Sequence, residues 1–394
     1  MTYILRIDGK IAKIPPKYNH IAQEIDQNQN KIISNQEIKD FLIKNDEVIL
    51  KKSKRNNTIL NENEIIKEFK QSLLDNLRKD FIRDYNQILE SIKKLQEKYL
   101  DKVKVEYIGK THEGRDIVAI KISTSNKEDK KSLLITGLHH AREWATAESA
   151  LNIAEKLLEQ YDTNQEVKNL LDNTVLHIIP VVNPDGYEYS LKTYSWWRKN
   201  RKPTEKAIGV DLNRNYYTDK NPELYRPAND KPDSTLDDYG ASDNPYSDTY
   251  RGPYGKSENE IQAIEKYTQE NKINAVIDLH SYGNMILFPW GHTHKPTQWD
   301  KIYREVAQEM SKKVMNKYRV MQSIELYPTT GCSTDYHHME GRFSYTLEIG
   351  RSFFPKDKEE LESIKNETLE MVKVFMSNLV SGKIPTQSYT ITQA

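Results

Sequence analysis

The chain has 394 residues, of which 37% are hydrophobic and 29% are charged. This composition is typical of a globular protein and excludes fibrous and wholly disordered classes. Lys plus Arg and Asp plus Glu both number 58, so no excess charge attracts nucleic acid or an anionic membrane. We therefore expect neither nucleic acid nor a membrane as a partner, and we predict a monomer.

The chain has a single cysteine, Cys332, so it forms no internal disulfide and its core is stabilised by burial alone. The first residues lack the apolar run of a signal peptide or membrane span, and Asp8 is already acidic. A single cysteine is compatible with the cytoplasm. The compartment stays open among a cytoplasmic protein, export by another route, and a chain shown without its leader.

Residues 1–80 are rich in Asn, Lys, Ile and Glu, and we predict that they form a small helical domain. Residues 26–37 match the calcium-binding loop of an EF-hand, except that Lys31 stands where glycine is expected and strains the turn. We expect a degraded second copy of the loop at 53–64, with Ile33 paired to Leu60. An Asn-rich turn between two helices is the alternative. The residues that would bind Ca²⁺ are Asp26, Asn28, Asn30, Ile32, Ser34 and Glu37.

From residue 81 onwards, helical and strand patterns alternate. We predict helices at 85–99, 144–161, 257–270, 298–315 and 358–378. We predict strands at 103–108, 117–122, 132–137, 175–182, 275–279, 285–288, 318–324 and 343–349. These elements indicate an α/β fold over residues 81–380, with a mixed, mostly parallel, twisted eight-stranded sheet flanked by helices, followed by a tail at 381–394.

Two histidines fall where predicted strands end. His140 follows the strand at 132–137, and His280 closes the strand at 275–279. In sheets of this kind, ligands bind at the carboxyl ends of the strands. Two imidazoles and the carboxylate of Glu143 would hold a catalytic zinc ion with one position open for water. The His-x-x-Glu spacing alone is a weak signal, because Glu is common in this chain.

Further motifs surround these residues in a characteristic order. They resemble the zinc metallocarboxypeptidase family of the carboxypeptidase A, B and T type over about residues 81–380. The resemblance implies one catalytic Zn²⁺ on His140, Glu143 and His280, and an exopeptidase that releases single amino acids from peptide or protein C-termini. The matching segments are 137–144, 183–187, 197–199, 209–215, 279–282, 326–327 and 345–348.

The resemblance also assigns the groups that carry the reaction. Glu348 is the expected general base, and its position at the end of an apolar strand should raise its pKa toward neutrality. Arg198 is the expected partner of the negative charge that develops on the substrate carbonyl. Asp211 is expected to orient His140 through a hydrogen bond.

Substrate binding is assigned in the same way. Asn213 and Arg214 match the clamp for the free C-terminal carboxylate, and Tyr327 matches the hydroxyl that caps it. Arg142 and Tyr282 match residues that touch the substrate upstream of the scissile bond.

Thr334 falls where the family selects the C-terminal side chain. Being small, neutral and polar, it predicts a broad or apolar-biased preference. Asp278 or Asp335 could bring charge near that pocket, and Cys332 could line it. His139, His292, His294, His337 and His338 match no family role.

Two alternatives remain for the function. One is a peptidoglycan-stem peptidase of the same family, and the other is an inactive, calcium-regulated peptide-binding protein. Residues 1–80 could also be a prosegment, in which case we expect the cut within residues 78–84.

Overall fold

The computed structural model describes residues 3–7, 10–14, 32–33, 81–225 and 240–386. The chain divides into two units, Met1–Asp80 and Phe81–Ala394. Each unit is described separately below.

The described residues of the first unit form a three-stranded sheet in the order β2-β1-β3. Its strands are β1 (Tyr3–Ile7), β2 (Lys10–Ile14) and β3 (Ile32–Ile33). The helical prediction is therefore wrong for these residues. β-branched isoleucines recur in both longer strands, and the intervening Asp8-Gly9 dipeptide is a hairpin signal that the helical interpretation overlooked. Ile33 pairs with Leu5, whereas the predicted partner, Leu60, lies outside the described residues.

The second unit is built on an eight-stranded sheet in the order β10-β9-β11-β8-β6-β7-β5-β4. Four pairings are parallel (β10 with β9, β11 with β8, β8 with β6, β6 with β7) and three are antiparallel. The predicted mixed, mostly parallel sheet is confirmed. The strands are β4 (Val103–Lys110), β5 (Asp116–Ile122), β6 (Lys131–Gly137), β7 (Thr174–Ile179), β8 (Ala275–His280), β9 (Met285–Phe288), β10 (Arg319–Gln322) and β11 (Phe343–Glu348).

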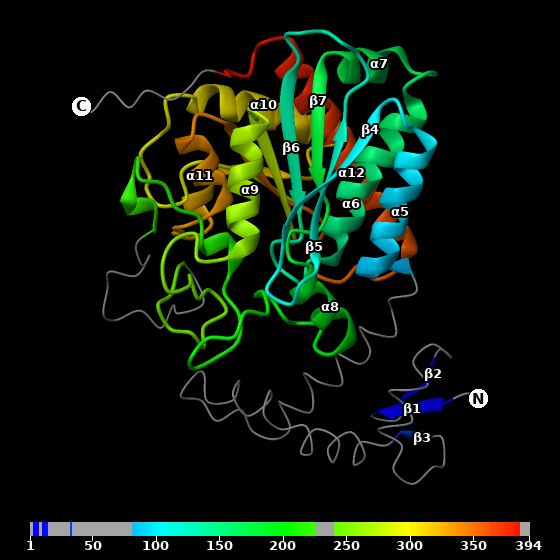
Figure 1. Cartoon of the computed structure of the whole chain (residues 1–394), viewed down its shortest axis with the longest axis vertical. Coiled ribbons are helices and arrows are strands. Elements are labelled where there is room, and N and C mark those ends of the chain that lie inside the picture. The colour runs from blue at the N-terminus through cyan, green and yellow to red at the C-terminus, as the bar shows by residue number, and fades with distance from the viewer. Residues whose placement is uncertain (1–2, 8–9, 15–31, 34–80, 226–239, 387–394) are drawn as a thin grey trace. The chain divides into compact units, whose positions relative to one another are not determined.

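Helices cover both faces of this sheet (Figure 1). They are α5 (Tyr85–Lys98), α6 (Trp144–Gln160), α7 (Gln165–Asp172), α8 (Pro184–Lys192), α9 (Asn259–Glu270), α10 (Asp300–Lys313), α11 (Ser333–Met339) and α12 (Lys358–Val380). Three short 3₁₀ helices lie at Leu212–Arg214, Pro222–Tyr225 and Ser323–Glu325. Among the described residues, no helix is both long and apolar enough to cross a membrane.

Alternate residues of β6 pack into two different hydrophobic cores, one on each face of the sheet. Leu133 and Ile135 pack in the larger core with residues of α6, α10 and α12, whereas Leu134 packs with α9 and α11. Successive side chains of a strand point to opposite faces, so a strand covered on both sides is apolar throughout. This is why these strands were recognisable as continuous apolar runs.

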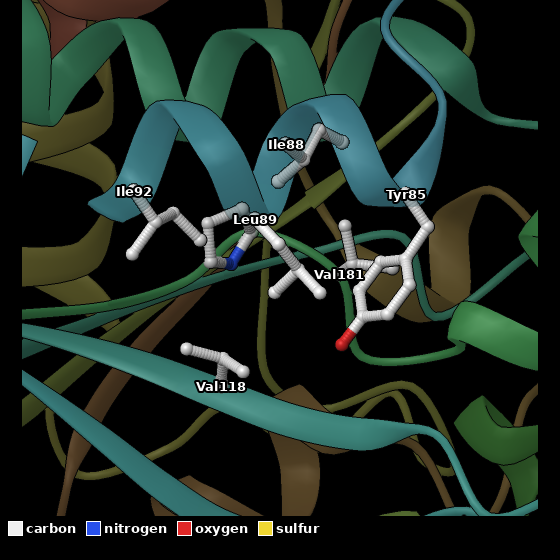
Figure 2. Close-up of a pocket in the computed structure, with 7 residues that line it drawn as sticks. Tyr85, Ile88, Leu89, Ile92, Val118 and Val181 are labelled. Carbon is white, nitrogen blue, oxygen red and sulfur yellow. The ribbon is translucent and has the colours of Figure 1, made fainter. Parts of the chain in front are cut away.

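The helix α5 begins at a complete capping box. The Asp84 side chain accepts from the Gln87 main chain, and the Gln87 side chain accepts from the Asp84 main chain. Figure 2 shows the apolar pocket beneath the helix, where Ile88 and Ile92 lie near Val118 of β5. The first helix of the second unit thus packs against the sheet through its apolar face.

Candidate active site

The three central parallel strands bring the candidate residues to one edge of the sheet. His140 lies in the loop after β6, and Glu143 is the residue that precedes the first turn of α6. His280 ends β8 and Glu348 ends β11, and these two residues are direct partners in the parallel pairing. Their convergence follows from strand order and register.

The side chains of His140, Glu143 and His280 meet in the interior. His140 Nδ1 lies 2.8 Å from Glu143 Oε1, and His280 Nδ1 lies 3.0 Å from Glu143 Oε2. The two Nδ1 atoms are 3.1 Å apart. All three residues are buried, and within the described part of the chain they form a group that could hold a metal ion.

This donor set fits zinc. His140 Nε2 lies 3.0 Å from Asp211 Oδ1, and His280 Nε2 lies 2.9 Å from Asp278 Oδ2. When each histidine donates its Nε2 proton to the aspartate, its Nδ1 presents a lone pair beside Glu143. Two lone pairs and a carboxylate that face one another repel unless a cation lies between them. Two imidazole nitrogens and one carboxylate are a ligand set of catalytic zinc sites.

Asp211 holds two candidate residues at once. Its Oδ1 faces His140, while its Oδ2 accepts from Arg198 Nε at 3.0 Å and lies 2.8 Å from an Arg198 Nη atom. Although burial opposes it, Arg198 and His140 hold the pKa of Asp211 well below its usual range. The guanidinium of Arg198 is therefore fixed in orientation beside the metal-binding group.

Glu348 stays partly exposed at the end of β11. Burial by the surrounding protein, opposed by His280 and reinforced by Glu143, raises the pKa of Glu348 to about 8. The direction is the one expected from the sequence. A carboxyl group with such a pKa exchanges a proton near neutral pH.

Asn213 and Arg214 are buried at the same edge. Arg214 donates from Nε to the Gly240 carbonyl at 3.1 Å and from Nη1 to the Asn213 carbonyl at 2.8 Å. Asn213 Oδ1 accepts from the Ser333 main chain at 2.7 Å. These bonds fix the amide and the guanidinium in place.

The rim of the site carries aromatic and cationic side chains. The Arg142 guanidinium lies 4.5 Å from the ring centre of Phe353, and the exposed ring of Tyr282 meets the same ring edge-on at 4.8 Å. Tyr327 is half-buried.

The Thr334 side chain is buried and hydrogen bonds through its hydroxyl to Thr346 of β11. Asp335 accepts from the Gly291 main chain at 2.9 Å and lies 2.8 Å from His292 Nδ1. Burial raises the pKa of the Cys332 thiol to about 12. This cysteine is therefore neutral at physiological pH.

The sequence interpretation missed how Asp278 and His139 are placed. Both are fully buried beside His280, with Asp278 Oδ1 2.9 Å from His139 Nδ1. Asp278 also faces His280, with Oδ2 2.9 Å from Nε2. The spacing Asp278-x-His280 was an available signal, because residues two apart in a strand share a face.

The proposed calcium ligands Asp26, Asn28, Asn30, Ser34 and Glu37 lie outside the described residues, and Ile32 belongs to β3.

The sequence also matches known proteins. The family model described as zinc carboxypeptidase matches residues 88–371. Carboxypeptidase A1 of Mus musculus is 32% identical over 251 residues, which cover 61% of this chain and 56% of the mouse protein. Carboxypeptidase O of Bos taurus is 30% identical over 314 residues, which cover 76% of this chain and 80% of the bovine protein. The chain thus spans little more than half the length of carboxypeptidase A1.

Solved structures also resemble the second unit of this chain. The crystal structure of thrombin activatable fibrinolysis inhibitor superposes with a TM-score of 0.69 at 28% identity, covering 76% of this chain and 75% of that chain. Carboxypeptidase A from Helicoverpa armigera has a TM-score of 0.66 at 24% identity, covering 97% of this chain and 92% of that chain, and shares the fold. On the match to residues 88–371, which is more than half its length, this chain belongs to the zinc carboxypeptidase family.

Proposed function

We propose that this protein is a zinc-dependent carboxypeptidase that hydrolyses the last peptide bond of peptides or proteins and releases single amino acids. The observation that carries the proposal is the convergence of His140 Nδ1, Glu143 and His280 Nδ1 on one point at the sheet edge. When bound there, zinc would polarise the scissile carbonyl and acidify a water molecule.

Glu348 is the proposed general base. It ends the strand next to His280, and its pKa of about 8 suits a group that takes a proton on a carboxylate oxygen and later returns it. In the reaction, Glu348 would accept the proton of the attacking water and donate it to the departing amine.

Arg198 is the proposed partner of the negative charge that develops on the carbonyl oxygen. Its guanidinium is buried and is fixed by two contacts with Asp211 Oδ2. A preorganised cation stabilises developing charge without having to reorganise during the reaction.

Arg214 and Asn213 are the proposed clamp for the terminal carboxylate of the substrate, and Tyr327 is its proposed cap. Two of the five N–H donors of a guanidinium are committed to main-chain carbonyls here, which sets the plane of Arg214. A planar guanidinium of fixed orientation is suited to a carboxylate. Arg142 and Tyr282 on the rim are the proposed contacts for upstream residues.

Thr334 is the proposed selector of the released side chain. Since its hydroxyl is already bonded to Thr346, we expect a broad or apolar-biased preference instead of a preference for Lys or Arg.

One experiment tests the function directly. The zinc-loaded protein is incubated with a peptide that has a free C-terminal carboxylate and with the same peptide as its C-terminal amide, and released products are identified by mass spectrometry. We expect stepwise loss of single residues from the free acid only. Internal cleavage, equal turnover of the amide, or binding without any hydrolysis would each reject the proposal.

The proposals for the first unit rest on the sequence. Residues 1–80 would form a separate module, retained or cleaved as a prosegment, and the loop from Asp26 to Glu37 would bind calcium. Titration calorimetry of the full chain tests this, and no heat of binding at millimolar Ca²⁺ contradicts it. The monomeric state is tested by light scattering.

A further inference from the structure

A second buried carboxylate lies behind the proposed metal site. Asp278 and His280 are two residues apart in β8, so their side chains share the face of the sheet that packs against α9 and α11. Asp278 Oδ2 lies 2.9 Å from His280 Nε2. Both residues are buried, and Asp278 has no exposed surface.

The other oxygen of Asp278 is held by two groups. Thr136 Oγ1 donates to Asp278 Oδ1 at 2.8 Å, and these two residues are direct partners in the parallel pairing of β6 and β8. His139 Nδ1 approaches the same oxygen at 2.9 Å. Both groups are fully buried, so the carboxylate cannot turn away from His280 without losing these contacts.

His139 is held in turn from its far side. Its Nε2 lies 2.8 Å from the hydroxyl of Tyr216, which is also buried. His139 Nδ1 lies at ion-pair distance from the Asp278 carboxylate but outside hydrogen-bond geometry, and its Nε2 can accept from the Tyr216 hydroxyl. His139 is thus held between Tyr216 and Asp278.

We propose that Asp278 and His139 form a positioning pair for His280: Asp278 keeps the proton on Nε2 so that Nδ1 faces the metal, and His139 holds Asp278 in that orientation. The proposal rests on the metal-binding role of His280 in the proposed function. It makes His280 the counterpart of His140, whose Nε2 faces Asp211.

The two carboxylates differ in one respect. Asp211 also fixes Arg198, whereas the contacts of Asp278 are with Thr136, His139 and His280. Loss of Asp211 would therefore disturb both zinc binding and charge stabilisation. Loss of Asp278 would act on zinc binding alone.

His139, Asp278 and His280 also form a group that could hold a metal ion themselves. The contacts argue for the positioning role. In the first group, two histidine nitrogens approach each other at 3.1 Å beside the Glu143 carboxylate, an arrangement suited to a cation between them. In this second group, no two histidine nitrogens approach each other in the contacts that the structure shows, and Asp278 lies 2.9 Å from a nitrogen of each histidine.

The test measures zinc affinity of the full chain by competition with a chromophoric chelator, alongside the number of zinc ions bound per chain. Asp278→Asn removes the charge at nearly unchanged volume. His139→Phe removes both nitrogens, and His139→Asn keeps an N–H near the position of Nδ1. His177→Phe is the matched control, because His177 is equally buried and its Nδ1 lies 2.8 Å from a tyrosine hydroxyl, that of Tyr267, on another part of the sheet.

We expect Asp278→Asn to weaken zinc binding about 10–100-fold, the range typical of groups that orient metal ligands. His139→Phe should weaken it about 10-fold, His139→Asn should restore most of the loss, and His177→Phe should leave it unchanged. With saturating zinc, KM for a peptide should stay at the wild-type value in every variant.

Wild-type zinc affinity in both Asp278→Asn and His139→Phe would overturn the positioning role. Two metal ions per wild-type chain, one of them lost in His139→Phe, would overturn it in favour of a second metal site. If His139→Phe does not fold, the zinc affinities of His139→Asn and Asp278→Asn still test the positioning role, each for its own residue. If the wild type releases no C-terminal residues but Asp278→Asn still weakens zinc binding, the proposed function fails and the positioning pair stands.

Discussion

The Nδ1 atoms of His140 and His280 face each other at 3.1 Å, although the two residues lie 140 positions apart in the chain. β6 and β8 are neighbouring parallel strands, so the loop after one and the end of the other share an edge of the sheet. Each ring has its Nε2 turned toward a carboxylate. This relationship is the basis of the first prediction.

Replacing His280 by alanine should abolish tight zinc binding. Loss of a direct ligand should weaken zinc binding more than loss of a group that orients a ligand, so we expect the zinc affinity to fall more than about 100-fold. Metal analysis after gel filtration measures the zinc content. His294→Ala is the control, because His294 is exposed, and a His280→Ala variant with one full equivalent of zinc would contradict the prediction.

Glu348→Gln should keep zinc and lose hydrolysis. The amide has nearly the same shape as the carboxyl group but cannot accept the proton of water. A positioned general base accelerates a reaction by about 10²–10⁴-fold, so we expect a loss of rate of this size. Single-residue release and zinc content are measured on the same sample. Glu270→Gln, at the exposed end of α9, should behave as the wild type; retained activity in Glu348→Gln would remove Glu348 from the mechanism.

Arg198→Lys should lower kcat by about 10²–10³ with little change in KM. A lysine ammonium cannot reproduce the planar fork that contacts Asp211 from two nitrogens. Steady-state kinetics on one peptide separates the two constants. An increase in KM at unchanged kcat would instead place Arg198 in ground-state binding.

Ionisation of Glu260 should lower the free energy of unfolding as pH rises. Burial, with a further contribution from Glu258, raises the pKa of Glu260 from 4.5 to about 8, and its Oε1 is buried without a hydrogen-bond partner among the described residues. Between these two pKa values the folded state binds more protons than the unfolded state. The contribution of Glu260 to stability is therefore present at low pH and lost as pH rises toward 8.

Urea unfolding at pH 5.5 and pH 8 measures this effect, each value compared with that of Glu260→Gln. We expect the wild type to lose at least about 1.4 kcal/mol relative to the variant over this interval, the value for one pKa unit. The exposed variant Glu128→Gln should show no such difference. A constant difference between wild type and Glu260→Gln would contradict the prediction.

Arg83 should be required for the stability of the second unit. Its main-chain N–H donates to Glu148 Oε1 at 2.7 Å, and its guanidinium lies 3.4 Å from Glu148 and 2.9 Å from Glu155. Arg83→Ala leaves the buried Glu148 with fewer donors, which costs about 1–3 kcal/mol. Melting temperatures should fall by roughly 2–10 °C, whereas the exposed Arg351→Ala should not change them.

The same contact refines the predicted cut within residues 78–84. A chain that begins at Phe81 keeps Arg83, and its second unit should melt at the temperature found for that unit in the full chain. A chain that begins at Asp84 should show the loss seen in Arg83→Ala. Equal melting temperatures for the two truncated chains would show that the Arg83 contacts do not stabilise the unit.

Periodicity predicted most of the fold of the second unit. The strand at 285–288 was placed at its observed bounds, and the other strands within three residues, because apolar runs bounded by polar residues are a local signal. The helices at Gln165–Asp172, Pro184–Lys192 and Ser333–Met339 were missed. Every residue of the last helix is buried, so it has no polar face to create an amphipathic pattern.

For the first unit, the prediction of helices was wrong in the residues that the structure describes. Asn-rich composition and loop spacing favoured helices, while Tyr3–Ile7 and Lys10–Ile14 pair as antiparallel strands. The signal for this pairing is the local order of β-branched residues around Asp8-Gly9, which a composition argument does not register. The predicted pairing of Ile33 with Leu60 is not tested, because Leu60 lies outside the described residues.

By itself, the sequence determined the types of group available for chemistry, from the His-x-x-Glu pair to Glu348 at a strand end, because these are local spacings on predictable elements. Only the tertiary structure decided which nitrogen of each histidine faces Glu143. That choice depends on Asp211 and Asp278, and on His139 behind Asp278. Asp211, His139 and His140 lie in loops, so their contacts depend on how loops distant in the sequence pack together at the sheet edge.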